Sequence, residues 1–165
     1  MNTWPLRTRS EGASLIEALL VMVLMAMLIG IAATNIFTGQ QHASFSTSRD
    51  GVIRDLRQQQ YSAMVGEVQA AGVYTDYSIR FESNQYILYP GSVYDSENPA
   101  NIVVPLEPTV EFSSIGFAND TITFARLSGE IRNFVQADST ITLRDTQTNE
   151  QTIITFNTHG IPFIE

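Results

Sequence analysis

The chain has 165 residues, of which 44% are hydrophobic and 16% are charged, which is typical of one ordinary domain. It carries 17 acidic and 9 basic residues, and this net charge of −8 disfavours general binding of nucleic acid because acidic surfaces repel phosphate. It contains no cysteine, which excludes disulfides and thiolate metal sites and leaves the redox compartment open.

Residues 13–37 form an almost continuously apolar segment, in which Glu17 is the one charged residue. A helix over this segment would be roughly 37 Å long, which is enough to cross the ~30 Å hydrocarbon core of a bilayer. We therefore predict a single membrane-spanning helix. Arg7 and Arg9 precede the segment, and no basic residue follows it until Arg49. This asymmetry predicts that the N-terminus lies in the cytoplasm and the rest of the chain on the other side of the cytoplasmic (inner) membrane that the family resemblance described below implies.

Glu17 requires an explanation, because a carboxylate at the centre of a membrane helix costs about 2.5–3.5 kcal/mol, and less near an end. Such a group is normally retained for a partner. If the chain were cut after Gly12, the new α-amino group of Ala13 would be a cation at the start of the apolar helix. In a packed helical filament, that amine can meet Glu17 of a neighbouring subunit and neutralise both charges.

These residues resemble the class III signal of type IV prepilins and pseudopilins: Gly12, Ala13, the run S-L-I-E that ends at Glu17, and the apolar segment beyond it. In that family the prepilin peptidase, a membrane aspartyl protease, cleaves after the glycine and methylates the new N-terminal amine. The resemblance implies a leader peptide of residues 1–12, cleavage between Gly12 and Ala13, and N-methylation of Ala13. It also implies an assembly role for Glu17 between pilin or pseudopilin subunits of an extracytoplasmic filament.

The alternative interpretation is an ordinary signal anchor or a secretory signal peptide. Ala32 and Ala33 are small residues of the kind that a signal peptidase accepts. This alternative leaves Glu17 unexplained, so we favour the prepilin interpretation.

Residues 38–71 show the pattern of an amphipathic helix that continues the membrane segment. The apolar residues that recur near helical spacing are Phe45, Val52, Leu56, Ala63, Met64 and Val68. The run Ala70-Ala71-Gly72 predicts the helix end, because glycine readily adopts the left-handed conformation found there.

Residues 72–165 change to a period of two, which is typical of β-strands with one buried face. The alternating residues are Tyr77, Ile79, Phe81; Tyr86, Leu88; Ile122, Phe124; Ile141, Leu143; and Ile154, Phe156. Short polar turns between them predict antiparallel hairpins. We therefore predict an α+β fold, with the long helix packed on one or more antiparallel sheets. The prepilin resemblance implies that this fold is pilin-like.

The segment 90–108 contains four of the six prolines and is predicted to be an irregular surface loop, a suitable place for partner recognition. Asp95, Glu97 and Asn98 could offer oxygen ligands to calcium, but their spacing does not match an EF-hand. We favour a solvated turn.

The second half resembles, more loosely, the minor pseudopilins of the GspH/FimT type, in which a long helix packs on two antiparallel sheets. The matching runs are D-L-R-Q-Q-Q-Y-S-A, I-T-F-A-R-L-S-G-E-I and the ending T-H-G-I-P-F-I. Some FimT-type subunits bind DNA through basic C-terminal residues. This chain ends in G-I-P-F-I-E, so we do not carry that activity over.

No catalytic, nucleotide-binding or metal-binding motif accompanies the two histidines, His42 and His159. We expect no enzyme activity, no cofactor, no metal and no catalytic residue. The predicted function is that of a minor pilin or pseudopilin in filament initiation or at the filament tip. A subunit that captures DNA or a substrate, and a membrane-anchored domain of other function, including an enzyme, remain alternatives. Type II secretion, a type IV pilus and a competence pseudopilus are all open.

Overall fold

The computed structural model describes residues 15–66, 74–132 and 134–164, with only the backbone described for residues 32–42. The chain divides into two compact units, Met1–Gln40 and Gln41–Glu165. The predicted leader peptide, residues 1–12, lies outside the described residues.

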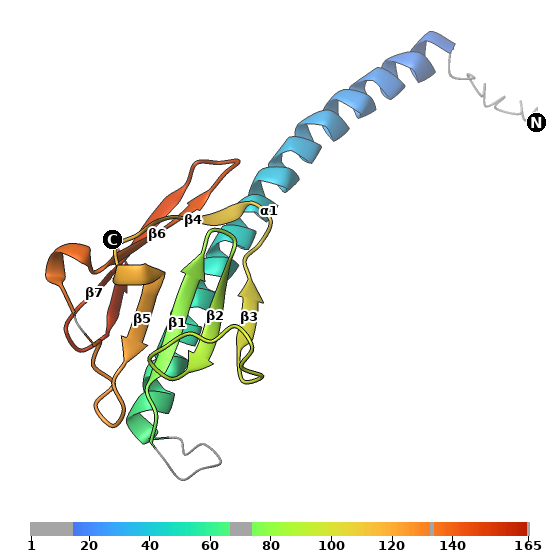
Figure 1. The fold of residues 1–165 in the computed structure, drawn as a ribbon. Coiled ribbons are helices and arrows are strands. Elements are labelled where there is room, and N and C mark those ends of the chain that lie inside the picture. Colours follow the sequence, from blue (N-terminus) through green and yellow to red (C-terminus); the bar gives the residue numbers. More distant parts are fainter. Residues whose placement is uncertain (1–14, 67–73, 133, 165) are drawn as a thin grey trace, which may run out of the picture. The chain divides into compact units, whose positions relative to one another are not determined.

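The described part of the first unit is the beginning of helix α1, Leu15–Val65 (Figure 1). Among the residues that the structure describes, no helix combines the length and the hydropathy needed to cross a membrane. The membrane-spanning helix over residues 13–37 stays a prediction. Residues 13 and 14, and the side chains of residues 32–37, lie outside the described residues.

The second unit contains the rest of α1 and two four-stranded sheets, which makes the chain an α+β protein as predicted. The first sheet has the order β3-β2-β1-β5 and the second the order β4-β6-β7-β8 (Figure 1), and all neighbouring strands are antiparallel. The strands are β1 Tyr77–Glu82, β2 Gln85–Pro90, β3 Ile102–Pro105, β4 Val110–Ile115, β5 Thr121–Phe124, β6 Thr140–Asp145, β7 Gln151–Phe156 and β8 Pro162–Ile164.

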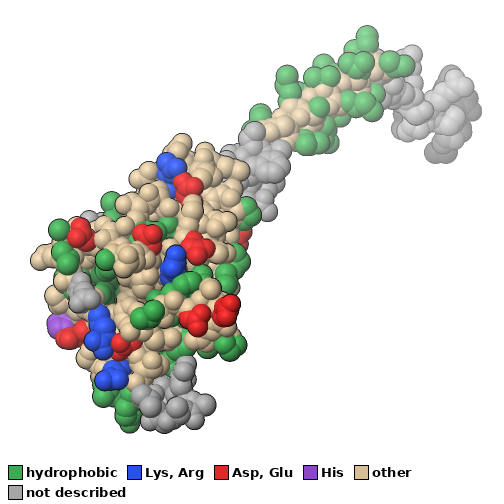
Figure 2. Space-filling model, viewed as in Figure 1, with side chains coloured by type: hydrophobic (Ala, Val, Ile, Leu, Met, Phe, Trp, Pro, Cys, Tyr) green, Lys and Arg blue, Asp and Glu red, His purple; other side chains and the backbone are tan. Residues whose placement is uncertain are grey.

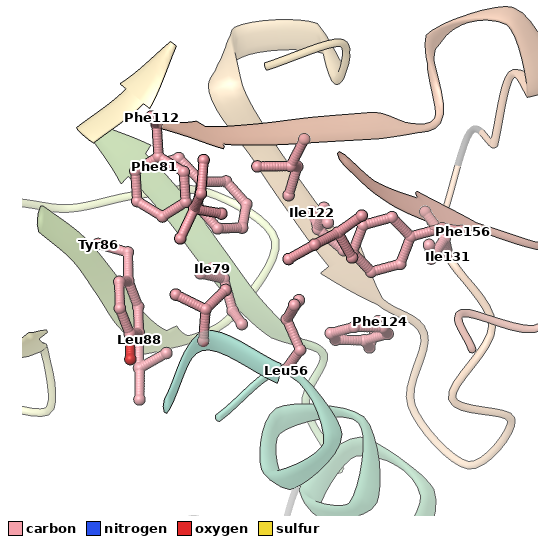
Figure 3. Close-up of a cluster of buried hydrophobic side chains, with 14 of the residues drawn as sticks. Leu56, Ile79, Phe81, Tyr86, Leu88, Phe112, Ile122, Phe124, Ile131 and Phe156 are labelled. Atoms are coloured by element: carbon pink, nitrogen blue, oxygen red, sulfur yellow. The ribbon is translucent and has the colours of Figure 1, made fainter. Parts of the chain in front are cut away.

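One core joins α1 and both sheets (Figure 3). Phe45, Val52, Leu56 and Ala63 lie on one face of α1 because their spacing follows the helical repeat. The buried strand residues are Ile79, Phe81, Tyr86, Leu88, Val110, Phe112, Ile122, Phe124, Ile141, Leu143, Ile154 and Phe156. The rings of Phe81 and Phe112 pack edge to face, with their centroids 5.1 Å apart, and this contact connects the first sheet to the second.

The prediction that residues 90–108 are irregular is wrong in its last part, because β3 lies there and pairs with β2. The side chains of β3 are largely exposed, so the segment lacks the alternation that reveals a half-buried strand. Pro105 is tolerated because β3 is an edge strand. A proline there has no N–H to donate, but an edge strand does not need a donor on its open side.

Helix α1 ends earlier than the predicted end at Ala71. It ends at Val65, and Gly66 follows with a φ of 66° in the left-handed region. A Cβ at Gly66 would lie 2.6 Å from a ring carbon of Tyr74, so both the backbone and the space require glycine. Residues 67–73, which include the predicted stop at Gly72, lie outside the described residues.

Replacing Leu56 by Ala is expected to destabilise the second unit by about 2–5 kcal/mol, because it leaves a cavity in the shared core. Leu56 is 1% exposed, whereas Val93 is 81% exposed, so Val93→Ala is the matched control and should change stability by less than about 0.5 kcal/mol. Urea unfolding followed by the near-ultraviolet dichroism of tyrosine measures this unit, since all 6 tyrosines lie in it. Equal effects of the two substitutions would contradict the assignment of the core.

Candidate functional site

Glu17, the predicted assembly residue, lies in the first described turn of α1 and is exposed. The large apolar side chains around it, such as Leu15, Ile16 and Leu19, are also exposed. Figure 2 shows hydrophobic side chains along this part of the helix. Gly12 and Ala13, the predicted cleavage and methylation positions, lie outside the described residues, so the pairing of Glu17 with an N-terminal amine stays a prediction.

A pocket of about 400 Å³ lies on the face of the first sheet that points away from the core. Arg80 of β1 and Thr121 and Thr123 of β5 contribute its floor, because they alternate with core residues along their strands. Tyr94 from the loop after β2 and Arg132 line its sides. The sequence did not predict this site, since its walls come from segments far apart in the chain.

The charge of Arg132 is offset by Asp76. The Nε of Arg132 lies 2.7 Å from Oδ2 of Asp76, and its Nη2 donates a hydrogen bond of 2.9 Å to Oδ1. The backbone N–H of Arg126 donates to the same Oδ1 at 2.9 Å. Burial alone would raise the pKa of Asp76, but these hydrogen bonds and the two guanidinium charges outweigh it and hold the pKa below its ordinary value.

Tyr86 links β2 to α1. Its hydroxyl donates a hydrogen bond of 2.6 Å to Oδ2 of Asp55. Burial raises the pKa of Tyr86, and the neighbouring Asp55 carboxylate raises it further because it stabilises the protonated hydroxyl. Tyr86 therefore stays neutral at physiological pH and acts as a structural donor between helix and sheet.

Asp145 ends β6 and is completely buried. Its Oδ1 accepts hydrogen bonds from the backbone N–H groups of Gln147 and Thr148, at 2.8 and 2.9 Å. Its Oδ2 accepts one from the hydroxyl of Thr109 at 3.2 Å. Burial raises the pKa of Asp145, but these donors outweigh burial and lower the pKa below its ordinary value. The carboxylate therefore organises the turn between β6 and β7.

The polar residues of the loop after β2 make local turns. Oδ1 of Asp95 accepts a hydrogen bond from the N–H of Glu97, and Oδ1 of Asn98 accepts one from the N–H of Ala100. These are the short-range bonds by which Asp and Asn form turns. Within the described part of the chain, no group of three or more His, Asp or Glu side chains could hold a metal ion.

The two histidines are far apart in the chain, and the structure describes the side chain of one of them. His159 lies in an exposed turn with its Nδ1 3.6 Å from Oε1 of Glu130. Its carbonyl oxygen accepts a hydrogen bond of 2.5 Å from Nε2 of Gln60. The side chain of His42 lies outside the described residues.

Comparisons with models of known protein families, with curated proteins and with solved structures find no match.

Asp145→Asn is expected to lower the free energy of unfolding at pH 7 by about 1–3 kcal/mol, because a buried, hydrogen-bonded carboxylate loses its charge. The pKa of Asp145 in the folded state lies below the ordinary value of 3.8. Its contribution to stability is thus fully present above that value and is lost as the pH falls through the folded-state pKa.

Urea unfolding between pH 2 and pH 7 should therefore show the wild-type protein and Asp145→Asn converging in acid. The control is Asp138→Asn, which makes the same chemical change at an exposed position. A stability difference between wild type and Asp145→Asn that stays constant across this range would refute the role given to the carboxylate.

Proposed function

We propose that this chain is the precursor of a minor pilin or pseudopilin, a non-enzymatic subunit of a type IV pilus-like or type II secretion filament. The observation that carries the proposal is the beginning of α1, where exposed apolar side chains run from Leu15 to Ile31 with Glu17 as the one charge. The prepilin-like residues Gly12 and Ala13 precede it in the sequence.

The apolar surface surrounds this part of the helix instead of forming a stripe. Each of the seven consecutive residues from Leu19 to Met25 is 48–72% exposed. Because successive helical residues point about 100° apart, these side chains cover the whole circumference. A helix that is apolar all round is stable only when lipid or other apolar helices cover it.

The proposed subunit occupies these two environments in turn, first the membrane and then the filament. Before assembly, residues 13–37 span the cytoplasmic membrane as a single helix with the leader on the cytoplasmic side. After the prepilin peptidase removes residues 1–12, the same helix packs against those of other subunits in an extracytoplasmic filament. The sequence has no nucleotide-binding motif, so a separate ATPase would drive polymerisation.

The second unit supports a minor-subunit role by its architecture. Its helix, from residue 41 to Val65, packs on two antiparallel sheets, the arrangement implied by the resemblance to GspH/FimT-type pseudopilins. Such a role needs no catalytic site, because it rests on assembly and on contacts of the exposed surface. The net charge of −8 gives no support to a general DNA-binding function.

Expression with a prepilin peptidase should give a mature chain that starts at Ala13, with or without an added methyl group. The measurement is intact mass together with N-terminal sequencing, and the control is expression without the peptidase, which should leave the leader in place. A chain that remains uncut with the peptidase, or that is cut near Ala33, would refute the prepilin assignment.

Glu17→Ala is expected to reduce incorporation into filaments by about tenfold or more, because an unpaired buried charge costs about 3–5 kcal/mol. Insertion into the membrane should be retained, since the substitution makes the helix more apolar. Immunoblots of sheared filaments and of membranes measure the two steps separately. Leu19→Ala shortens an apolar side chain of the same helix and keeps the charge of Glu17, so it should reduce incorporation less than Glu17→Ala does. Normal incorporation of Glu17→Ala would exclude the pairing with the amine.

A further inference from the structure

The pocket on the outer face of the first sheet is built by the sheet and by the loop that follows β2. Figure 1 shows this loop in front of β1 and β2. Gly91 fixes the start of the loop, because its N–H donates to the carbonyl of Asp76 at 2.7 Å and its carbonyl accepts from the hydroxyl of Ser78 at 2.6 Å. The ring of Tyr94 then packs edge to face on Tyr89, with ring centroids 5.3 Å apart.

Arg80 is the cation of this pocket with the least compensation. Its guanidinium lies over the ring of Tyr94, 4.8 Å from the centroid. Oε1 of Glu82 lies 3.9 Å from the Nε of Arg80, and the other oxygen of Glu82 accepts a hydrogen bond of 2.6 Å from Nε2 of Gln85. The Nε of Arg80 is buried and has no hydrogen-bond partner among the described residues.

The local charge of the pocket is opposite to that of the whole chain. The described residues that line it include Arg80 and Arg132 and no Asp or Glu. Asp76 holds Arg132 with contacts of 2.7 and 2.9 Å, whereas Glu82 approaches Arg80 only to 3.9 Å, so Arg80 carries the less compensated positive charge of the pocket. The pocket therefore suits an anion with a single charge, and a guanidinium suits a planar carboxylate in particular.

The other walls suit a ring that carries hydroxyl groups. Tyr94 and Phe117 offer aromatic surface, while Ser92 and Asn119 offer exposed groups that both donate and accept hydrogen bonds. A volume of about 400 Å³ falls in the range of small-molecule sites, and such sites combine apolar walls with a few polar groups.

We propose that this pocket binds an acidic sugar, a uronate, with Arg80 on the carboxylate and Tyr94 against the ring. Asn119 and Ser92 hydrogen-bond the sugar hydroxyls. The site belongs to the second unit and is independent of the proposed role in filaments. Its test therefore uses neither processing nor assembly as a readout.

Isothermal titration of the full chain in detergent micelles tests the proposal with two probes that differ in the carboxylate alone. Methyl glucuronide should bind, and the neutral methyl glucoside should bind at least about tenfold more weakly, as expected for a charged hydrogen bond. Arg80→Gln should weaken glucuronide binding by a similar factor. Arg57→Gln removes the same charge at an exposed position outside the pocket and should leave the affinity unchanged.

Three results would overturn the proposal: no binding of glucuronide, equal binding of the two probes, or equal affinities of wild type and Arg80→Gln. Displacement of glucuronide by a lower concentration of inorganic phosphate would also overturn it, because the site would then select phosphate. Thermal unfolding followed by far-ultraviolet circular dichroism checks that each variant is folded. If Arg80→Gln does not fold, Tyr94→Leu replaces it, and unchanged glucuronide affinity in Tyr94→Leu excludes the site.

Discussion

The apolar face of α1 between Phe45 and Ala63 is the surface that holds the second unit together. Its four core residues are at most 1% exposed, and they meet the inner faces of both sheets. Each sheet has four strands and contributes buried apolar residues to the core, such as Ile79 of β1 and Ile141 of β6, and a sheet cannot bury its apolar face alone. The helix provides this cover, and the hydrogen bond from Tyr86 to Asp55 fixes the helix against β2.

The same helix presents two different surfaces along its length, and the difference bears on function. From Phe45 onward, apolar residues recur on one side, so the protein's own sheets bury them. Between Leu15 and Ile31, apolar residues occur at nearly every position, and the described residues of the chain leave them exposed. A surface of this kind is typical of a helix that lipid or other helices cover. The proposed filament subunit has such a cover twice, first in the membrane and then in the assembly.

The features that the sequence predicted are those determined by local periodicity. Ile79 and Phe81 alternate with polar neighbours, and so do Ile141 and Leu143, because each pair lies on a strand with one buried face. The β3 strand was missed since both of its faces are largely exposed, and the burial of Tyr89 was missed since a loop from later in the sequence covers it. The early end of α1 coincides with the left-handed φ of Gly66, and the close approach of Tyr74 to Gly66 brings together two positions that no helical pattern links. The prepilin-like signal, by contrast, is a contiguous run of residues that can be recognised in the sequence alone. Its first residues lie outside the described part of the structure.

In β1, side chains that stabilise the core alternate with a side chain that lines the outer pocket. Ile79 and Phe81 point into the core, and Arg80 between them points to the outer face. Substitutions at Arg80 or in the loop that carries Tyr94 can change the outer pocket while the core contacts remain. The start of the loop is anchored through Gly91 to Asp76 and Ser78 by main-chain and hydroxyl contacts, which do not depend on the side chains that line the pocket. A domain built this way can change the residues of its outer face without losing the fold that presents them.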